Sequence, residues 1–258
     1  MNGDMMQNML ASVSTEIETN VDIVFVIDVT GSMSGTIDTV KKATLTFHES
    51  LKEKLAEYHR SLSQLRVKVV WFRDYYADGT SAYGESEFME LPAQKEDFYS
   101  FVSGLTATGG GDTPETSLEA LTLAMRSDFV QEGERKRHIV ILFTDAPAHP
   151  FEERETLTKE ANKAKRTVIY PDNMPKDLDE FYNAWDGNSK NQGMLGANRR
   201  TTKLDLTGRR LILFAPDQYP WNDMPNKLKF VWRHDLPVDS APDMSDVYKV
   251  LAMSMATN

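Results

Sequence analysis

The sequence of 258 residues contains no cysteine. Disulfide bonds, thiol catalysis, zinc–thiolate sites and iron–sulfur clusters are therefore excluded. Long apolar runs are also missing, and none approaches the roughly 18 residues that a membrane-spanning helix needs. Residues 1–20 contain no lysine or arginine and no apolar segment of signal-peptide length. We therefore expect no secretion signal, no membrane association and a cytoplasmic location.

Basic residues are in the minority, with 29 Lys and Arg against 39 Asp and Glu and a formal net charge of −10. Nucleic-acid binding depends on clustered cations, so we expect no nucleic-acid partner. Hydrophobic residues make up 40% of the chain and charged residues 26%, which is ordinary for a globular protein. A chain of this length can bury a sizeable core.

Segments rich in β-branched and aromatic residues alternate with amphipathic segments along the chain. Buried strands are expected at 21–29, 65–72, 138–143, 210–215 and 228–233, with a short edge strand at 87–91. Alternating strands and helices predict a three-layer α/β domain with a mostly parallel sheet. The apolar stripe from Ile37 to Tyr58 predicts one long helix after the first strand.

The chain shows no internal repeat and no linker, so we predict a single domain over 21–258 after a flexible lead-in at 1–20. Residues 167–208 depart from the alternating pattern. They are rich in Asn, Gly and Arg toward their end and contain too few apolar residues for a core of their own. We therefore predict an insertion at about 167–208 that contains a short helix at 176–185.

The first expected strand ends in a run of oxygen-bearing side chains. Asp28, Thr30 and Ser32 occupy every second position, and an amphipathic helix follows Gly35. Two interpretations are open for this stretch. The side chains cap the helix, or they are ligands of a hard cation such as Mg²⁺.

Two later loops carry matching chemistry. Thr113 lies in a loop with three consecutive glycines, and Asp145 follows the expected strand at 138–143. In open α/β sheets, ligands bind outside the carboxyl ends of the strands. If the two strands are neighbours, Thr113 and Asp145 join Asp28, Thr30 and Ser32 at one edge. Two carboxylates and three hydroxyls form an all-oxygen set that suits Mg²⁺ or Mn²⁺.

Three motifs together resemble those of von Willebrand factor A domains. They are Asp-Val-Thr-Gly-Ser-Met (28–33), Gly-Gly-Gly-Asp-Thr-Pro-Glu (109–115) and Leu-Phe-Thr-Asp-Ala (142–146). In that family they form the metal-ion-dependent adhesion site, and Thr30 stands where the family has a serine. The resemblance covers about 21–255 apart from 167–208. It implies a Rossmann-like, mostly parallel six-stranded sheet of order 3-2-1-4-5-6 with one antiparallel edge strand.

The resemblance also implies a function. Asp28, Thr30, Ser32, Thr113 and Asp145 are the expected metal ligands, with Mg²⁺ as the expected ion and Mn²⁺ or Ca²⁺ as alternatives. An Asp or Glu carboxylate of a protein partner would complete the coordination. Intracellular members of the family often serve as adaptors in multi-component assemblies. We therefore expect a Mg²⁺-dependent protein–protein interaction module rather than an enzyme.

The competing hypothesis is a metal-dependent hydrolase or phosphatase that uses the same cation. A bound Mg²⁺ polarises phosphoryl or acyl oxygens, and His149, four residues after Asp145, is the candidate base. Against this hypothesis, the sequence offers no second acidic cluster and no nucleophile–base pair. We expect His149 to be a surface residue of its loop.

Overall fold

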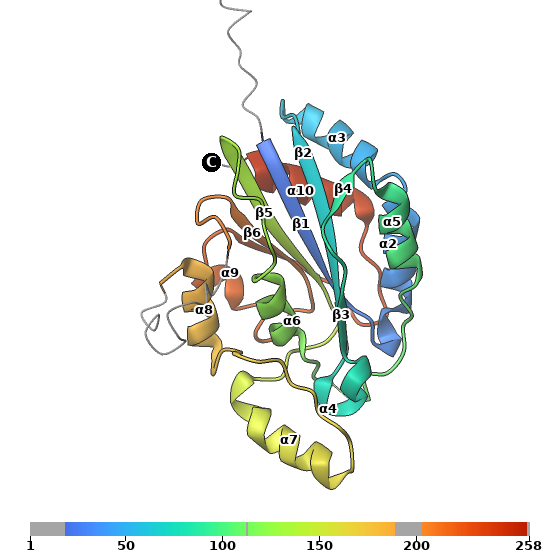
Figure 1. The fold of residues 1–258 in the computed structure, drawn as a ribbon, viewed down its shortest axis with the longest axis vertical. Coiled ribbons are helices and arrows are strands. Elements are labelled where there is room, and N and C mark those ends of the chain that lie inside the picture. Colours follow the sequence, from blue (N-terminus) through green and yellow to red (C-terminus); the bar gives the residue numbers. More distant parts are fainter. Residues whose placement is uncertain (1–18, 112, 189–202, 257–258) are drawn as a thin grey trace, which may run out of the picture.

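The computed structural model describes residues 19–111, 113–188 and 203–256. These residues form a seven-stranded sheet of order β3-β2-β1-β5-β6-β7, with β4 also paired to β2 (Figure 1). The strands are β1 (Thr19–Asp28), β2 (Gln64–Phe72), β3 (Tyr83–Glu85), β4 (Met89–Leu91), β5 (Arg135–Phe143), β6 (Arg209–Phe214) and β7 (Val231–His234). The α-helices are α2 (Ser34–Thr44), α3 (Phe47–Glu57), α4 (Tyr75–Asp78), α5 (Lys95–Ser103), α6 (Ser117–Ala124), α7 (Arg154–Lys163), α8 (Leu178–Asp186), α9 (Met224–Lys227) and α10 (Met244–Ala256). Short 3-10 helices are η1 (Gly31–Met33), η2 (Gly79–Ser81) and η3 (Phe151–Glu153).

The sheet confirms the predicted mostly parallel α/β fold. β1 pairs in parallel with β2 and β5, and the parallel series continues through β6 to β7. The antiparallel edge differs from the prediction because it consists of two short strands, β3 and β4, which gives seven strands instead of six. Ser86 separates them: its N–H donates to the Val69 carbonyl, while its hydroxyl accepts the Val69 N–H.

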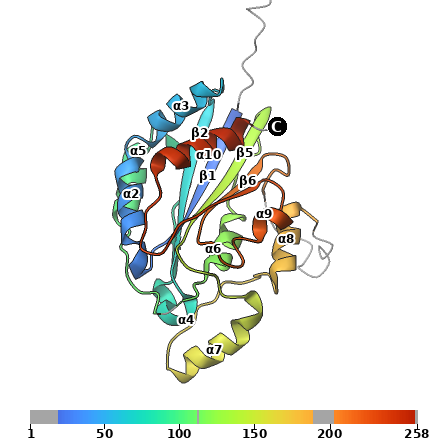
Figure 2. The same ribbon diagram turned by 180° about the vertical axis from the view of Figure 1, so that it is seen from behind.

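Helices cover both faces of the sheet (Figures 1 and 2). One apolar cluster joins the sheet to α2, α3, α5 and α10, and a second joins it to α6, α8 and α9. Side chains alternate between the two clusters along β1, with Phe25 in the first and Val24 and Val26 in the second. This alternation explains why residues 23–27 of β1 are all apolar, as a central parallel strand should be.

The long helix predicted from Ile37 to Tyr58 is two helices. α2 ends at Thr44, and α3 begins at Phe47. The Thr44 hydroxyl donates to the Lys41 carbonyl at 2.8 Å. Such bonds from Ser and Thr side chains to preceding carbonyls compete with the helical ladder and bend helices. The break lets α2 pack against α5 while α3 packs against α10.

The expected insertion contains the predicted short helix, observed as α8. Two of its aromatic side chains, Phe181 and Trp185, are fully buried in the second apolar cluster. Residues 1–18 of the expected lead-in and 189–202 of the expected insertion lie outside the described residues. Among the helices of the described ranges, none has the length and apolarity needed to cross a bilayer.

Candidate metal centre

Asp28, the first predicted ligand, is the last residue of β1 and is fully buried. Its Oδ1 accepts a hydrogen bond from the Thr30 backbone N–H at 2.9 Å and another from the Thr30 hydroxyl at 2.6 Å. Its Oδ2 accepts a third bond, 2.7 Å long, from the hydroxyl of Thr144, the residue after β5. Asp28 therefore connects the carboxyl ends of two neighbouring parallel strands, β1 and β5.

Asp145, the second predicted carboxylate, lies one residue beyond Thr144. Its Oδ1 accepts a hydrogen bond from the Ser32 hydroxyl at 3.0 Å, and its Oδ2 accepts the backbone N–H of Asp239 at 3.2 Å. The first bond links the loop after β5 to η1, where Ser32 lies. The second brings the segment between β7 and α10 to the same edge of the sheet.

The helix-cap interpretation of the 28–32 stretch is wrong in this structure. Thr30 precedes η1 and Met33 precedes α2, and neither position has a side-chain cap hydrogen bond. The Thr30 hydroxyl donates to Asp28, and the Ser32 hydroxyl donates to Asp145. The polar side chains of this stretch are therefore directed at the two carboxylates.

Among the described residues, no basic side chain forms an ion pair with either carboxylate. Within the described ranges, the hydrogen bonds that Asp28 and Asp145 accept come from hydroxyl and backbone N–H groups, and neither carboxylate is in an ion pair. Burial raises the pKa of Asp28 to about 6, the bonds from Thr30 and Thr144 lower it, and the nearby charge of Asp145 raises it further. Two neighbouring buried acids of this kind are the environment that a bound cation would neutralise.

The donor set fits a hard cation. The described residues contain no group of three or more His, Asp or Glu side chains placed to hold a metal. An ion at this edge would therefore need the hydroxyls of Thr30, Ser32 and Thr113 in addition to the two carboxylates. A mixed carboxylate and hydroxyl set that leaves room for water matches the preference of Mg²⁺.

Thr113 stands apart from the other four predicted residues. Its side chain is exposed, and it forms no hydrogen bond with another described residue. Its loop does reach the first stretch, because the Thr108 N–H donates to the Val29 carbonyl and the Gly31 N–H donates to the Gly109 carbonyl. The structure therefore brings Asp28, Thr30, Ser32 and Asp145 together and places only the backbone of the Thr113 loop against them.

Gly110 is where this loop meets the predicted ligands. Its φ is +93°, in the region that favours glycine. A Cβ built at Gly110 would lie 2.8 Å from the Thr30 side chain and 2.8 Å from the Glu115 Oε1. Glu115 in turn donates its N–H to the Pro147 carbonyl in the loop after β5. The absence of a side chain at Gly110 lets the three loops pack together.

We predict that Gly110→Ala lowers the free energy of unfolding by about 1–3 kcal/mol, because it combines a strained φ with two contacts that are too short. Displacement of Thr30 should also weaken binding of the Mg²⁺ ion expected at this site by about tenfold, in the range seen when groups that orient metal ligands are changed. Chemical denaturation and titration calorimetry measure the two effects.

Gly35→Ala is the matched control for this change. A Cβ at Gly35 would have its nearest neighbours, Ala241 Cβ and the Ser240 carbonyl oxygen, at 3.8 Å, which is an ordinary contact. Gly35 lies in α2 without a positive φ, so alanine should be neutral or slightly stabilising. Equal effects of the two substitutions would contradict the packing role of Gly110.

Two residues that organise the site were not predicted. Thr144 supplies a hydrogen bond to Asp28, and Asp239 supplies its backbone N–H to Asp145. A hydroxyl residue directly before Asp145 at a strand end was a usable signal for Thr144. The Asp239 contact depends on a backbone group from a distant segment, and a single sequence carries no signal for it.

The expectation that His149 lies on the surface is wrong. Its side chain is buried, and its ring packs edge-on against Tyr76 with the centroids 5.5 Å apart. The His149 N–H donates to the Glu115 carbonyl at 2.9 Å, beside a bridge between Glu115 and Ala148. These backbone contacts draw the loop inward and bury the histidine.

Comparison with known proteins places part of the chain in a family context. A family model described as the von Willebrand factor A domain matches residues 88–173, which include Thr113 and Asp145. The match supports a von Willebrand factor A domain in this chain. The solved structure of a von Willebrand factor type A protein from Catenulispora acidiphila is similar at 13% identity and a TM-score of 0.44, over 92% of this chain and 43% of that one.

Two curated relatives share sequence with about half of the chain. An ariadne-like RING finger protein of Acanthamoeba polyphaga mimivirus is 30% identical over 147 residues, which are 55% of this chain and 13% of the relative. The alpha-protein kinase vwkA of Dictyostelium discoideum is 30% identical over 132 residues, which are 51% of this chain and 19% of the kinase. The chain therefore spans less than a fifth of the length of these relatives.

Proposed function

We propose that this protein is a Mg²⁺-dependent protein-binding module of the von Willebrand factor A type. The main observation in support of this proposal is a pair of carboxylates, Asp28 and Asp145, at one edge of the sheet. Neither has a basic partner among the described residues. Bound there, Mg²⁺ would supply a positively charged coordination position for an Asp or Glu carboxylate of the partner. Mn²⁺ and Ca²⁺ are the alternative ions.

The residues at this edge have distinct roles in this proposal. Thr30 and Ser32 present hydroxyl oxygens, and the carboxylates to which they now donate hold these side chains in place. Thr144 orients Asp28, and the Asp239 N–H orients Asp145. Thr113 is exposed and is free to act when a partner arrives.

A metal-dependent hydrolase on the same cation remains the competing proposal, and the binding module is favoured over it. His149, its candidate general base, is buried and packs on Tyr76. A general base must reach the proton that it removes, directly or through one water. The proposed role is therefore recognition without turnover.

We further propose that the module acts as an adaptor in an intracellular, cytoplasmic assembly. The support comes from the two curated relatives and from the share of each that resembles this chain. Similar segments make up a small share of a protein named as a RING finger protein and of one named as a kinase. A segment shared by two proteins with such different names is suited to binding rather than to one chemical reaction.

Calorimetry and peptide binding test the proposal. Mg²⁺ at a hundredfold excess over its dissociation constant should stabilise the wild type by about 2.7 kcal/mol. Asp145→Asn should remove most of that gain. Peptides that contain one Glu should bind in Mg²⁺ but not in EDTA, whereas their Gln counterparts should bind in neither, and Thr113→Ala should weaken the Glu peptides.

Asp239→Asn is the control. Asp239 is exposed, and only its backbone N–H contacts Asp145, so the variant removes a neighbouring charge without removing a proposed ligand. Asparagine also tolerates the Asp239 φ of +57°. An equal Mg²⁺ response in wild type and Asp145→Asn would refute the proposed site. Turnover of phosphate or acyl esters that is lost in Asp145→Asn would favour the hydrolase.

A further inference from the structure

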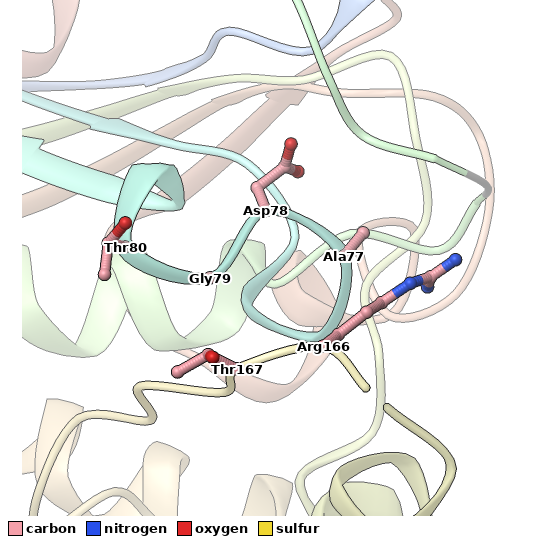
Figure 3. Close-up of a pocket in the computed structure, with 6 residues that line it drawn as sticks. All are labelled: Ala77, Asp78, Gly79, Thr80, Arg166 and Thr167. Atoms are coloured by element: carbon pink, nitrogen blue, oxygen red, sulfur yellow. The ribbon is translucent and has the colours of Figure 1, made fainter. Parts of the chain in front are cut away.

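A small pocket lies where α4 and η2 meet the segment after α7 (Figure 3). Its volume is about 280 Å³. One wall comes from α4 and η2, and the other from the segment after α7. The lining residues are Ala77, Asp78, Gly79, Thr80, Arg166 and Thr167. The two walls touch at Gly79, where an added Cβ would lie 2.7 Å from the Thr167 carbonyl oxygen.

The pocket is joined to the candidate metal centre through the glycine loop. The Asp78 Oδ2 accepts the Gly110 N–H at 3.0 Å, and a Cβ at Gly109 would lie 2.1 Å from the Asp78 Oδ1. On its other side, Gly110 packs against the side chain of Thr30. The backbone of residues 109–111 is thus the divider between the pocket and the proposed cation. These three residues carry no side chains, so an extended segment of a partner can cross the divider.

The lining holds one acidic and one basic side chain, Asp78 and Arg166, and Arg166 is the group that suits an anion. The guanidinium of Arg166 is exposed and forms neither a hydrogen bond nor an ion pair with any side chain in the described part of the chain. The Oδ2 of Asp78 accepts the N–H groups of Gly110 and Asp74, and in Figure 3 the carboxylate points in a different direction from Arg166. The hydroxyls of Thr80 and Thr167 add further polar groups to the lining.

Resting on the proposed function, we infer that the pocket binds a second anionic side chain of the same protein partner. The first carboxylate would occupy the proposed cation, and the second anion would lie against Arg166. A planar guanidinium pairs in two-pronged fashion with carboxylates and with phosphoryl groups. The second group is therefore a Glu or Asp side chain or a phosphorylated residue. The proposal makes Arg166 a specificity residue for partners with paired acidic groups.

Synthetic peptides with one fixed Glu test this inference by fluorescence anisotropy in Mg²⁺ and in EDTA. A second Glu, or a phosphoserine, is placed at successive positions on either side of the fixed residue, on a background of Gly, Ser and Ala. At the matching spacing, the second charge should tighten Mg²⁺-dependent binding by about tenfold. The Glu and phosphoserine series distinguish the two sources of the anion.

Arg166→Gln should reduce that advantage to within about twofold of the single-Glu peptide. Lys163→Gln is the matched control, because it removes the same charge near the end of α7 without lining the pocket. It should keep most of the advantage, since exposed charges at a distance are screened by salt. Thermal melting confirms that both variants fold, as expected for exposed side chains.

The outcomes separate the two proposals. If no spacing improves on the single-Glu peptide, or if the advantage persists in Arg166→Gln, the inference about the pocket is overturned while the proposed function stands. Equal losses of the affinity advantage in Arg166→Gln and Lys163→Gln would also overturn it. The advantage would then come from the positive charge of this part of the surface and not from the pocket. If no acidic peptide binds in a Mg²⁺-dependent way, the proposed function fails and this inference fails with it.

Discussion

Trp185→Ala should lower the free energy of unfolding by about 3–5 kcal/mol, the range for removal of a fully buried aromatic side chain. The Trp185 indole is fully buried in the second apolar cluster, and its Nε1–H donates to the Lys229 carbonyl at 3.1 Å. The Arg209 guanidinium lies over the ring, 5.7 Å from its centroid. Truncation would leave a large cavity and an unpaired carbonyl. Urea denaturation followed by circular dichroism measures the loss.

Trp185→Phe separates the two parts of this effect. Phenylalanine keeps most of the apolar volume but cannot donate to Lys229, so we expect a loss of about 1–3 kcal/mol from the unpaired carbonyl. An alanine variant within about 1 kcal/mol of wild type would contradict the packing seen here. In that case α8 would be a peripheral attachment rather than part of the core.

Trp185 lies in the part of the chain whose structure was hardest to predict from the sequence. The 167–208 segment was expected to be an insertion because its apolar content is too small for a core of its own. That argument is sound for an independent domain, but α8 adds Phe181 and Trp185 to a core that the sheet already provides. Composition over a window cannot show that two aromatic residues complete a distant cluster.

The central sheet was more predictable. β1 contains the apolar run 23–27 and β5 the apolar run 139–143, and polar residues follow both, so the burial of these runs on both faces follows from the sequence alone. The edge was less predictable, since the division into β3 and β4 depends on one serine side chain that replaces a backbone group opposite Val69. The break after Thr44 was missed because the apolar stripe continues through it.

In the candidate site, too, some residues could be predicted from the sequence and others could not. The motifs identified Asp28, Thr30, Ser32 and Asp145, and the parallel pairing of β1 with β5 explains why they converge. The position of the Thr113 side chain depends on a loop with three glycines, whose backbone freedom a single sequence leaves undetermined.

A second result is expected at Glu119, a residue outside the proposed site. It is buried on α6, and its Oε1 accepts the Tyr170 hydroxyl at 2.5 Å. Its Oε2 is buried without a hydrogen-bond partner among the described residues. Burial raises the pKa of Glu119 to about 7, the Tyr170 bond and the charge of Arg154 lower it, and the charge of Asp74 raises it. Tyr170 connects this group to the segment between α7 and α8.

The direction of the pH dependence follows from this raised pKa. Below the ordinary value of 4.5, the carboxyl is protonated in both the folded and the unfolded chain, and its contribution to stability is fully present. Above pH 4.5 the unfolded chain releases the proton while the folded chain still holds it, so this contribution to stability declines. It is lost once the pH has risen through about 7. At about 1.4 kcal/mol per pKa unit, the interval corresponds to about 3 kcal/mol.

Glu119→Gln should remove this dependence, because the amide can still accept the Tyr170 hydroxyl but cannot ionise. The variant should therefore be more stable than wild type above neutral pH by about 3 kcal/mol, with the difference shrinking toward pH 4.5. Denaturation curves at a series of pH values measure it.

Tyr170→Phe sharpens the test of Glu119. The hydroxyl bond lowers the pKa of Glu119, so its removal should move the loss of stability to higher pH, in the direction opposite to a shift caused by better solvation. Glu160→Gln, an exposed change on α7, serves as the control and should leave the pH profile unchanged. A difference between wild type and Glu119→Gln that is the same at every pH would show that Glu119 does not titrate in this interval. The buried carboxyl would then have to be explained by a partner for its Oε2 that holds it charged throughout.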